Sequence, residues 1–208
     1  MAPLESLIHL RPYLYHLTAA SNIPHIRKIR EIHSAARLFE LAHRQDLASV
    51  RRKNHKTITV EGEQVTIRDQ APLHPGNVTL GSNWSFGDLV AELNRFVFFW
   101  PGNAISPIGY GLRHFQRYRK EDICILCIPF LDLVSANPRC EPFVCRYNSG
   151  SPRCSGGKPS PRSAETFRSI NRSKLRPGQV VEVAFTPSIT LPMSCKVGTL
   201  DLKAWVQL

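Results

Sequence analysis

Two kinds of apolar periodicity divide this chain, and their order constrains the fold more than any other feature of the sequence. Helical spacing predicts helices over residues 23–33, 35–47 and 86–93. Period-two or continuous β-prone runs predict strands over most of the remaining chain. The expected strands are 14–18, 57–60, 65–67, 96–100, 123–128, 180–185 and a terminal strand from 198 that contains Trp205. Because helices cluster early and strands dominate later, we expect an α+β fold with a mostly non-parallel sheet.

Turns and caps between these elements are also predicted. Glu61-Gly62-Glu63, between two β-prone runs, predicts the turn of a hairpin. Ser21 or Asn22 can cap the first helix, and Ser34 opens the second. Residues 103–120 show no feature beyond a mixed loop and helix.

The length of 208 residues suits one compact domain, so we treat residues 1–208 as a single unit. One segment departs from globular composition. Residues 146–163, RYNSGSPRCSGGKPSPRS, are rich in Ser, Pro and Gly and carry several basic side chains. Such a composition does not pack a core, and it predicts an exposed, mobile basic loop.

The formal net charge is +11, and it is unevenly distributed. Residues 1–56 hold ten Lys or Arg against four Asp or Glu, and residues 111–178 hold thirteen against five. Between them, residues 57–110 carry an acidic excess. Two basic flanks favour an anionic partner such as nucleic acid, cofactor phosphates or a lipid surface. The alternative is a solvated basic face that only aids solubility.

The apolar runs also bear on cellular location. No window approaches 18 consecutive apolar residues, which excludes a membrane-spanning helix. The start, MAPLESLIHLRPYLYH, is interrupted by charged residues and has no small-residue cleavage site, so it does not resemble a secretory signal. We expect a cytoplasmic protein without a membrane partner.

The cysteines do not predict a metal site. Cys124 and Cys127 form a CxxC, but they lie in the β-rich run DICILCIPFL. Residues three apart on a strand point to opposite faces, so the two thiolates cannot hold one ion. Cys140, Cys145 and Cys154 are spaced too loosely for a paired zinc knuckle. Buried or free thiols are the expected state.

No catalytic signature such as GxSxG, HExxH, a Walker loop or GxGxxG is present. Three strand-borne features remain as candidates. The first is Tyr15-His16-Leu17-Thr18, followed by Asn22. His16 and Thr18 share one strand face and can bind a ribose or a carboxamide, although a histidine satisfied within the core is the plainer interpretation.

The second feature is Phe98-Phe99-Trp100, which is typical of core but can also supply a stacking wall for an aromatic ring. The third is Glu182 within VVEVAF. A carboxylate among apolar residues on a central strand is costly to desolvate unless it is paired or lies in a cleft. A solvent-facing glutamate on an edge strand is the alternative.

The order of these three features along the chain resembles that of the ADP-ribosyltransferase superfamily: a His-x-Thr motif first, an aromatic strand midway and a strand glutamate near the end. LYHLTAASNIPHI is similar to the opening of the DarT-type enzymes, which modify DNA bases. The resemblance implies a split antiparallel β-sheet core with N-terminal helices and NAD as the substrate. It also implies that His16, Thr18 and Asn22 bind NAD, that Phe98 stacks on nicotinamide, and that Glu182 is catalytic.

A closer resemblance is to an uncharacterised bacterial family that shares YH-T, IRDQ-P and LN-R-VFFW over roughly residues 13–185. It names no activity. DarT enzymes also use an arginine downstream of the first motif. Arg51 and Arg52 lie at a similar distance, and Arg68 in IRDQ is the rival candidate. Each candidate also has a plainer interpretation. Arg51 and Arg52 can simply belong to a solvated turn, and Arg68 can pair with a carboxylate and brace its loop.

The resemblance implies an NAD-dependent mono-ADP-ribosyltransferase. The basic segment before Glu182 favours a DNA or RNA acceptor, with a protein acceptor as an alternative. A bacterial toxin or phage-defence effector with a neutralising antitoxin partner is the expected role. The competing interpretations are a non-enzymatic nucleic-acid-binding protein and an NAD-dependent RNA 2′-phosphotransferase, whose arginine–histidine signature is not evident here.

Overall fold

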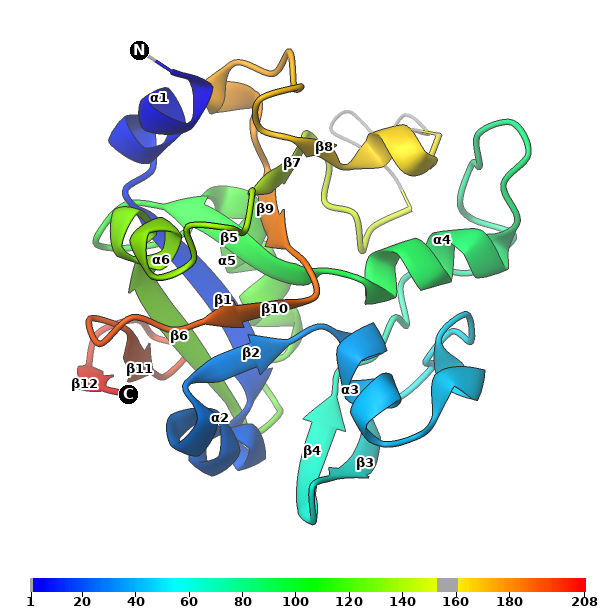
Figure 1. Ribbon diagram of the computed structural model, residues 1–208, viewed down its shortest axis with the longest axis horizontal. Helices are drawn as coiled ribbons and strands as arrows, with labels where there is room; N and C mark the ends of the chain where they lie inside the picture. The colour runs from blue at the N-terminus through cyan, green and yellow to red at the C-terminus, as the bar shows by residue number, and fades with distance from the viewer. Residues whose placement is uncertain (1, 153–160) are drawn as a thin grey trace.

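The computed structural model describes residues 2–152 and 161–208 and shows a mixed α+β architecture (Figure 1). Its helices are α1 (Pro3–Leu10), α2 (Ile23–Ile29), α3 (Ala35–Leu41), α4 (Phe86–Asn94), α5 (Gly109–Arg117) and α6 (Phe130–Ala136). Its strands are β1 (Tyr13–Ala19), β2 (Glu31–His33), β3 (Lys56–Val60), β4 (Glu63–Ile67), β5 (Val97–Gly102), β6 (Ile123–Pro129), β7 (Phe143–Cys145), β8 (Arg168–Ser169), β9 (Glu182–Phe185), β10 (Ser188–Thr190), β11 (Lys196–Gly198) and β12 (Trp205–Gln207). Short 3-10 turns include η1 (Ala20–Asn22).

The main sheet has the strand order β12-β11-β6-β1-β5-β9-β7-β8, and each of its strand pairings is antiparallel. Two small antiparallel pairs, β10–β2 and β3–β4, lie beside it. The expected α+β class and the non-parallel sheet are therefore confirmed.

Strand β5 joins two halves of the sheet. Its C-terminal half pairs with β1 through Trp100–Gly102, and its N-terminal half pairs with β9 through Val97–Phe99. The β1–β5 ladder ends at the pair Tyr15–Trp100, although β1 continues to Ala19 along β6. An opening therefore separates β1 from β5 beyond this pair, with main-chain groups on its border that need other partners.

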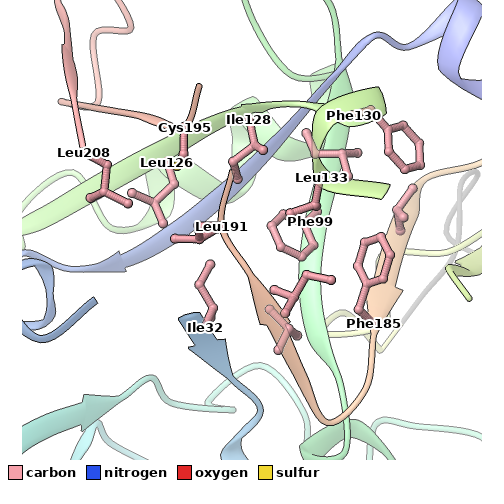
Figure 2. Close-up of a cluster of buried hydrophobic side chains, with 14 of the residues drawn as sticks. Ile32, Phe99, Leu126, Ile128, Phe130, Leu133, Phe185, Leu191, Cys195 and Leu208 are labelled. Atoms are coloured by element: carbon pink, nitrogen blue, oxygen red, sulfur yellow. The ribbon is translucent and has the colours of Figure 1, made fainter. Parts of the chain in front are cut away.

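The two faces of the sheet carry different hydrophobic clusters. One face, with Leu14, Phe99 and Val183, is covered by α1, α2, α6 and the β2–β10 pair. Figure 2 shows side chains from β2, β5, β6, β9 and α6 converging in this cluster. On the other face, α5 packs against the half that contains β1 and β6, and α4 packs against the half that contains β9. Residues of both α5 and α4, among them His114 and Leu93, line the cavity described below.

The hairpin β3–β4 matches its prediction. Glu61 and Gly62 form the two-residue turn with φ of 50° and 83°, the conformation that glycine tolerates best. Asn22 fastens this hairpin to the end of β1. Its amide nitrogen donates to the Thr66 carbonyl at 2.9 Å and to the Thr18 hydroxyl at 3.0 Å, and its oxygen accepts from the Thr66 N–H at 2.8 Å.

The prediction of one helix over 23–33 was wrong. Helix α2 ends at Ile29 because Arg30 adopts a left-handed conformation with φ of 55°. Residues 31–33 then pair with β10. Ile32 is buried in this strand, and a helix over 23–33 would bury it as well. The spacing of the apolar residues therefore could not distinguish a continuous helix from a helix followed by a strand. The predicted capping by Ser21 or Asn22 is also absent, since the Asn22 side chain is directed to the hairpin instead.

Two other boundaries needed correction. Helix 35–47 begins as expected, with Ser34 accepting from the Arg37 N–H, but it ends at Leu41 because His43 adopts a φ of 54°. The terminal strand expected from residue 198 is two short strands, β11 and β12, which pair with each other. A turn over 199–204 separates them, closed by the N–H of Leu202 on the Thr199 carbonyl.

The exposed loop predicted for 146–163 is correct only in part at its two described ends: Arg146, Gly150 and Pro161 are exposed, but two other side chains are buried. Ser149 is 3% exposed, and Arg162 is completely buried. Residues 153–160, which include Cys154, lie outside the described residues. The composition of the segment indicated solvent exposure, but side chains at its two ends are enclosed by other segments of the fold.

Cys124 and Cys127 lie on opposite faces of β6, in the two different hydrophobic clusters. Within residues 2–152 and 161–208, no three His, Cys, Asp or Glu side chains are grouped in a way that could hold a metal ion. None of the helices in those ranges has the length and apolar character to cross a bilayer.

We predict that Asn22→Ala destabilises the protein, because it leaves both main-chain groups of Thr66 without their partner. The expected loss is about 2–4 kcal/mol in the free energy of unfolding, and a melting temperature lower by roughly 5–15 °C. Thermal unfolding followed by circular dichroism measures it. Asn54→Ala, at an exposed position, is the control and should melt like the parent. Equal melting of both variants would contradict the bracing role.

Candidate functional site

One cavity of about 530 Å³ opens where β1 and β5 separate. This volume lies within the range of about 300–1,000 Å³ that is usual for small-molecule sites. The walls come from β1, the hairpin, β5, β9, α5 and the segment 148–152. Seven of the residues nominated from the sequence line this cavity: His16, Thr18, Asn22, Arg52, Arg68, Phe98 and Glu182. Arg51, which the sequence offered together with Arg52, is not part of the lining.

His16 lies at the opening between β1 and β5. Its Nδ1 is 2.8 Å from the carbonyl oxygen of Phe98, a strand residue just beyond the end of the β1–β5 ladder. Since a carbonyl only accepts, Nδ1 carries the hydrogen and Nε2 keeps its lone pair. Burial lowers the pKa of His16 to about 4, and the charge of Arg68 acts in the same direction. The ring is therefore neutral at pH 7 and can accept a hydrogen bond through Nε2.

Strand register explains how His16 and Glu182 reach one cavity. The β5–β9 ladder puts Phe98 and Glu182 on the same face of the sheet, and Trp100 shares that face. Tyr15 is opposite Trp100, so strict alternation would direct His16 to the other face. Because pairing stops there, the imidazole fits into the opening, against the Phe99 ring at 5.5 Å between centroids, and the cavity spans the two halves of the sheet.

Glu182 is 3% exposed at the start of β9. The Ser149 N–H donates to its Oε2 at 3.1 Å. Removal from water raises the pKa of this carboxyl to about 7, while hydrogen bonds from Ser149 and the charge of Arg162 lower it only in part. Near neutral pH, Glu182 therefore exchanges between an acid and a carboxylate, a property typical of groups that move protons.

Arg162 supports the wall beside Glu182, and sequence reasoning missed it. Its Nη2 donates to the Ser151 carbonyl at 2.8 Å, and its guanidinium lies 4.7 Å from the centre of the Tyr147 ring. Its main chain bonds in turn to Thr79 and Gly81. A Cβ on Gly81 would come within 2.9 Å of the Ser163 side chain, so glycine permits this close approach.

Phe98 forms an aromatic wall. Its ring packs against Phe96 and Phe167, with centroid distances of 6.1 and 5.5 Å, and it also lines the cavity. A ring that is supported from behind by two others is held in place and can offer its exposed side to a flat ligand.

Arg52 and Arg68 both line the cavity, and both are already engaged. Arg52 donates from Nε to the Arg68 carbonyl and from Nη1 to Asn94 Oδ1, each at 2.8 Å. Burial lowers the pKa of Arg52 to about 10, so it stays charged at neutral pH. Arg68 stacks on Tyr118 at 3.7 Å and donates to Glu121 at 3.2 Å. The plainer interpretation of Arg68 as a brace therefore describes part of what it does.

Thr18 and Asn22 differ in whether they keep a hydrogen-bond donor for a ligand. Both amide hydrogens of Asn22 are used by Thr18 and Thr66, so this side chain holds the cavity wall and has no N–H free for a ligand. The Thr18 hydroxyl accepts from Asn22 and keeps its own hydrogen. Thr18 is therefore the better donor of the two.

His114 on α5 is a second histidine of the cavity that sequence reasoning missed. It packs between Trp100 and Tyr118, with centroid distances of 5.3 and 5.2 Å. Burial lowers its pKa to about 4, with smaller contributions from Arg68 and Arg117. The sequence held no signal for it, because residues 103–120 showed no feature beyond a mixed loop and helix.

The arrangement combines a buried carboxylate, a neutral imidazole, an aromatic wall and guanidinium groups around one space. It can hold a ligand that has a flat ring, sugar hydroxyls and negative charge. It can also place a carboxylate next to a centre that becomes positive, where a low-dielectric environment strengthens the attraction.

The chain belongs to a protein family of unknown function, DUF7002, whose model matches residues 12–195. This match covers β1, β5 and β9, which line the cavity, together with the hairpin. Comparison with curated proteins gave no match, and comparison with solved structures gave none either.

We predict that Glu182→Gln raises stability at neutral and alkaline pH. The folded-state pKa of about 7 exceeds the ordinary value of 4.5, so the folded state holds its proton longer and the parent loses stability as pH rises between these values. The amide of the variant keeps an oxygen for the Ser149 N–H but carries no charge. The expected gain is about 2–3 kcal/mol at pH 8, and it should vanish near pH 4.

Denaturant unfolding of parent and variant at pH 4, 6 and 8 measures this gain. A variant that is less stable than the parent at pH 8 would show that nearby positive charge, rather than burial, dominates at Glu182.

Proposed function

We propose that this protein is an NAD-dependent mono-ADP-ribosyltransferase with a split antiparallel sheet of the ADP-ribosyltransferase type. The observation that carries the proposal is the meeting of His16, Phe98 and Glu182 at one cavity, from three strands far apart in the sequence. Two features of the sheet also support the proposal. β1 and β5 separate to form an opening, and the two halves of β5 pair with different strands, β1 and β9.

The cavity suits the parts of NAD. Phe98 offers a flat apolar surface for the nicotinamide ring. His16 accepts through Nε2, and Thr18 donates through its hydroxyl, which together suit the hydroxyls of a ribose. Arg52 or Arg68 would offset the diphosphate charge, since guanidinium groups match phosphate oxygens geometrically. Arg52 is the more promising of the two, because its terminal nitrogen Nη2 has no hydrogen-bond partner in the described part of the chain.

Glu182 would act on the bond between nicotinamide and ribose. As this bond breaks, its electron pair leaves with nicotinamide and positive charge develops on the ribose. The carboxylate of Glu182 stabilises that charge, and it can orient the 2′-hydroxyl. The acceptor atom then bonds to the same ribose carbon, and Glu182 can take the proton that the acceptor loses. A pKa near 7 suits a group that is charged in one step and protonated in another.

A nucleic acid is the acceptor class that the charge distribution favours. Residues 111–178, which include most of α5 and the segment beside Glu182, carry the largest basic excess of the chain. Incubating labelled NAD with DNA, RNA and lysate protein shows which fraction keeps the label. A cytoplasmic toxin or phage-defence effector, neutralised by an antitoxin protein, is the role that such an activity would serve.

We predict that Glu182→Gln binds NAD as the parent does, within about threefold, but loses transfer by about 10²–10⁴-fold, the range for removal of a general acid–base group. Calorimetry gives the affinity, and label transfer gives the rate. Glu61→Gln, at an exposed turn position, is the matched control and should keep both.

Retained transfer in Glu182→Gln would remove this residue from the catalytic role. Absence of NAD binding by the parent would favour the competing interpretation, a non-enzymatic nucleic-acid-binding protein.

We predict that kcat/KM for transfer rises about tenfold between pH 6 and pH 8, because the carboxylate form of Glu182 is populated above its pKa of about 7. His16, with a pKa of about 4, stays neutral across this range and does not contribute. Initial rates at subsaturating NAD measure the profile. A flat profile, or one that falls with pH, would contradict the proposed ionisation.

A further inference from the structure

Helix α5 places two arginines at the mouth of the cavity. Arg113 and Arg117 are four residues apart, so they lie on one side of the helix, and both are exposed and line the cavity. His114 lies between them in the sequence and packs inward, against Trp100. None of these three residues has a role in the transfer chemistry described above.

Neither arginine is neutralised by a carboxylate. Among the described residues, Arg113 and Arg117 take part in no ion pair, whereas several arginines elsewhere do. The Arg113 guanidinium lies 4.7 Å from the centre of the Tyr110 ring, and that of Arg117 lies 6.0 Å from the Tyr118 ring. Stacking on an aromatic face orients a guanidinium and leaves its N–H edges available.

The carboxylates nearby have other partners. Asp69 accepts from the Ala71 N–H at 2.8 Å and lies 3.2 Å from the His55 imidazole. Glu121 lies 2.7 Å from the other nitrogen of His55 and accepts from Arg68. The positive charge at the mouth is therefore not cancelled from within the described part of the chain.

His114 is the polar group behind these arginines. It lines the cavity, and neither of its ring nitrogens forms a hydrogen bond within residues 2–152 and 161–208. A neutral imidazole always carries one N–H, which can donate to an oxygen in the cavity. Its place between two aromatic rings holds the imidazole in position at the cavity wall.

We infer that Arg113, Arg117 and His114 form a phosphate-binding subsite at the mouth of the cavity. Two guanidinium groups without a carboxylate partner, together with an imidazole that lines the cavity, match the tetrahedral oxygens and negative charge of a phosphate group. The phosphate comes either from a nucleotide in the cavity, such as the diphosphate of NAD, or from the backbone of a nucleic acid acceptor. The second source rests on the proposed function, whereas phosphate binding itself does not.

The test compares two double variants with the same change in charge. Arg113→Gln/Arg117→Gln removes the subsite arginines. Arg119→Gln/Lys120→Gln removes two exposed positive charges that follow α5 closely and do not line the cavity. The probes are ADP, adenosine as its phosphate-free counterpart, and fluorescein-labelled single-stranded DNA and RNA. Calorimetry follows the first two, and fluorescence anisotropy follows the oligonucleotides.

We expect the subsite variant to bind at least one phosphate-bearing probe about tenfold more weakly or worse, while the control variant stays within about twofold of the parent. Weaker binding of ADP with unchanged adenosine identifies a nucleotide diphosphate as the source. Weaker binding of oligonucleotides alone, with a reduced salt dependence, identifies the acceptor backbone.

The inference is overturned if the parent binds neither ADP nor oligonucleotide, if the subsite variant binds both like the parent, or if both double variants weaken equally. A chain that shows this pattern of phosphate binding but no label transfer would keep the subsite and lose the transferase proposal, so the two failures can be told apart.

Discussion

The hydrogen bond from His16 Nδ1 to the Phe98 carbonyl is the interaction on which the site depends. It occurs where β1 stops pairing with β5, and it gives the Phe98 carbonyl a partner at the border of the opening. The same bond fixes the tautomer of the imidazole and leaves its other nitrogen able to accept from a ligand. The sheet can therefore open at this point without leaving the Phe98 carbonyl without a hydrogen-bond partner. A ligand in the opening can contact both halves of the sheet.

Glu182 shows how the fold sets the chemistry of a single group. Its carboxyl is buried at the first residue of β9, and the N–H of Ser149 donates to it. The burial that raises its pKa also opposes folding in the charged state, so this residue is retained at a cost in stability. Arg162 offsets part of that cost and holds the segment of Ser149 to Ser151 in position. A buried acid with such support is typical of a functional group rather than of a core position.

The sequence allowed prediction of features that depend on local pattern. The strands with strong β propensity, the Glu61–Gly62 hairpin and the Ser34 cap were expected and are present. The residues nominated for the site came from an ordered resemblance to a known superfamily, and the fold brings them to one cavity. Errors arose where apolar spacing fits two structures, as at Ile32, and where composition was taken to indicate exposure, as at Arg162.

What the sequence determined by itself was the main set of strands, their largely non-parallel class and the polar residues placed among apolar ones. It could not determine that β1 and β5 separate beyond the Tyr15–Trp100 pair, because strand register is a property of two segments and their neighbours. It also could not indicate His114, Arg113 or Arg117, which reach the cavity only because α5 packs on the face of the sheet that carries Trp100. The tertiary structure decided these contacts, since side chains distant in sequence share an environment only after the sheet and its helices have packed together.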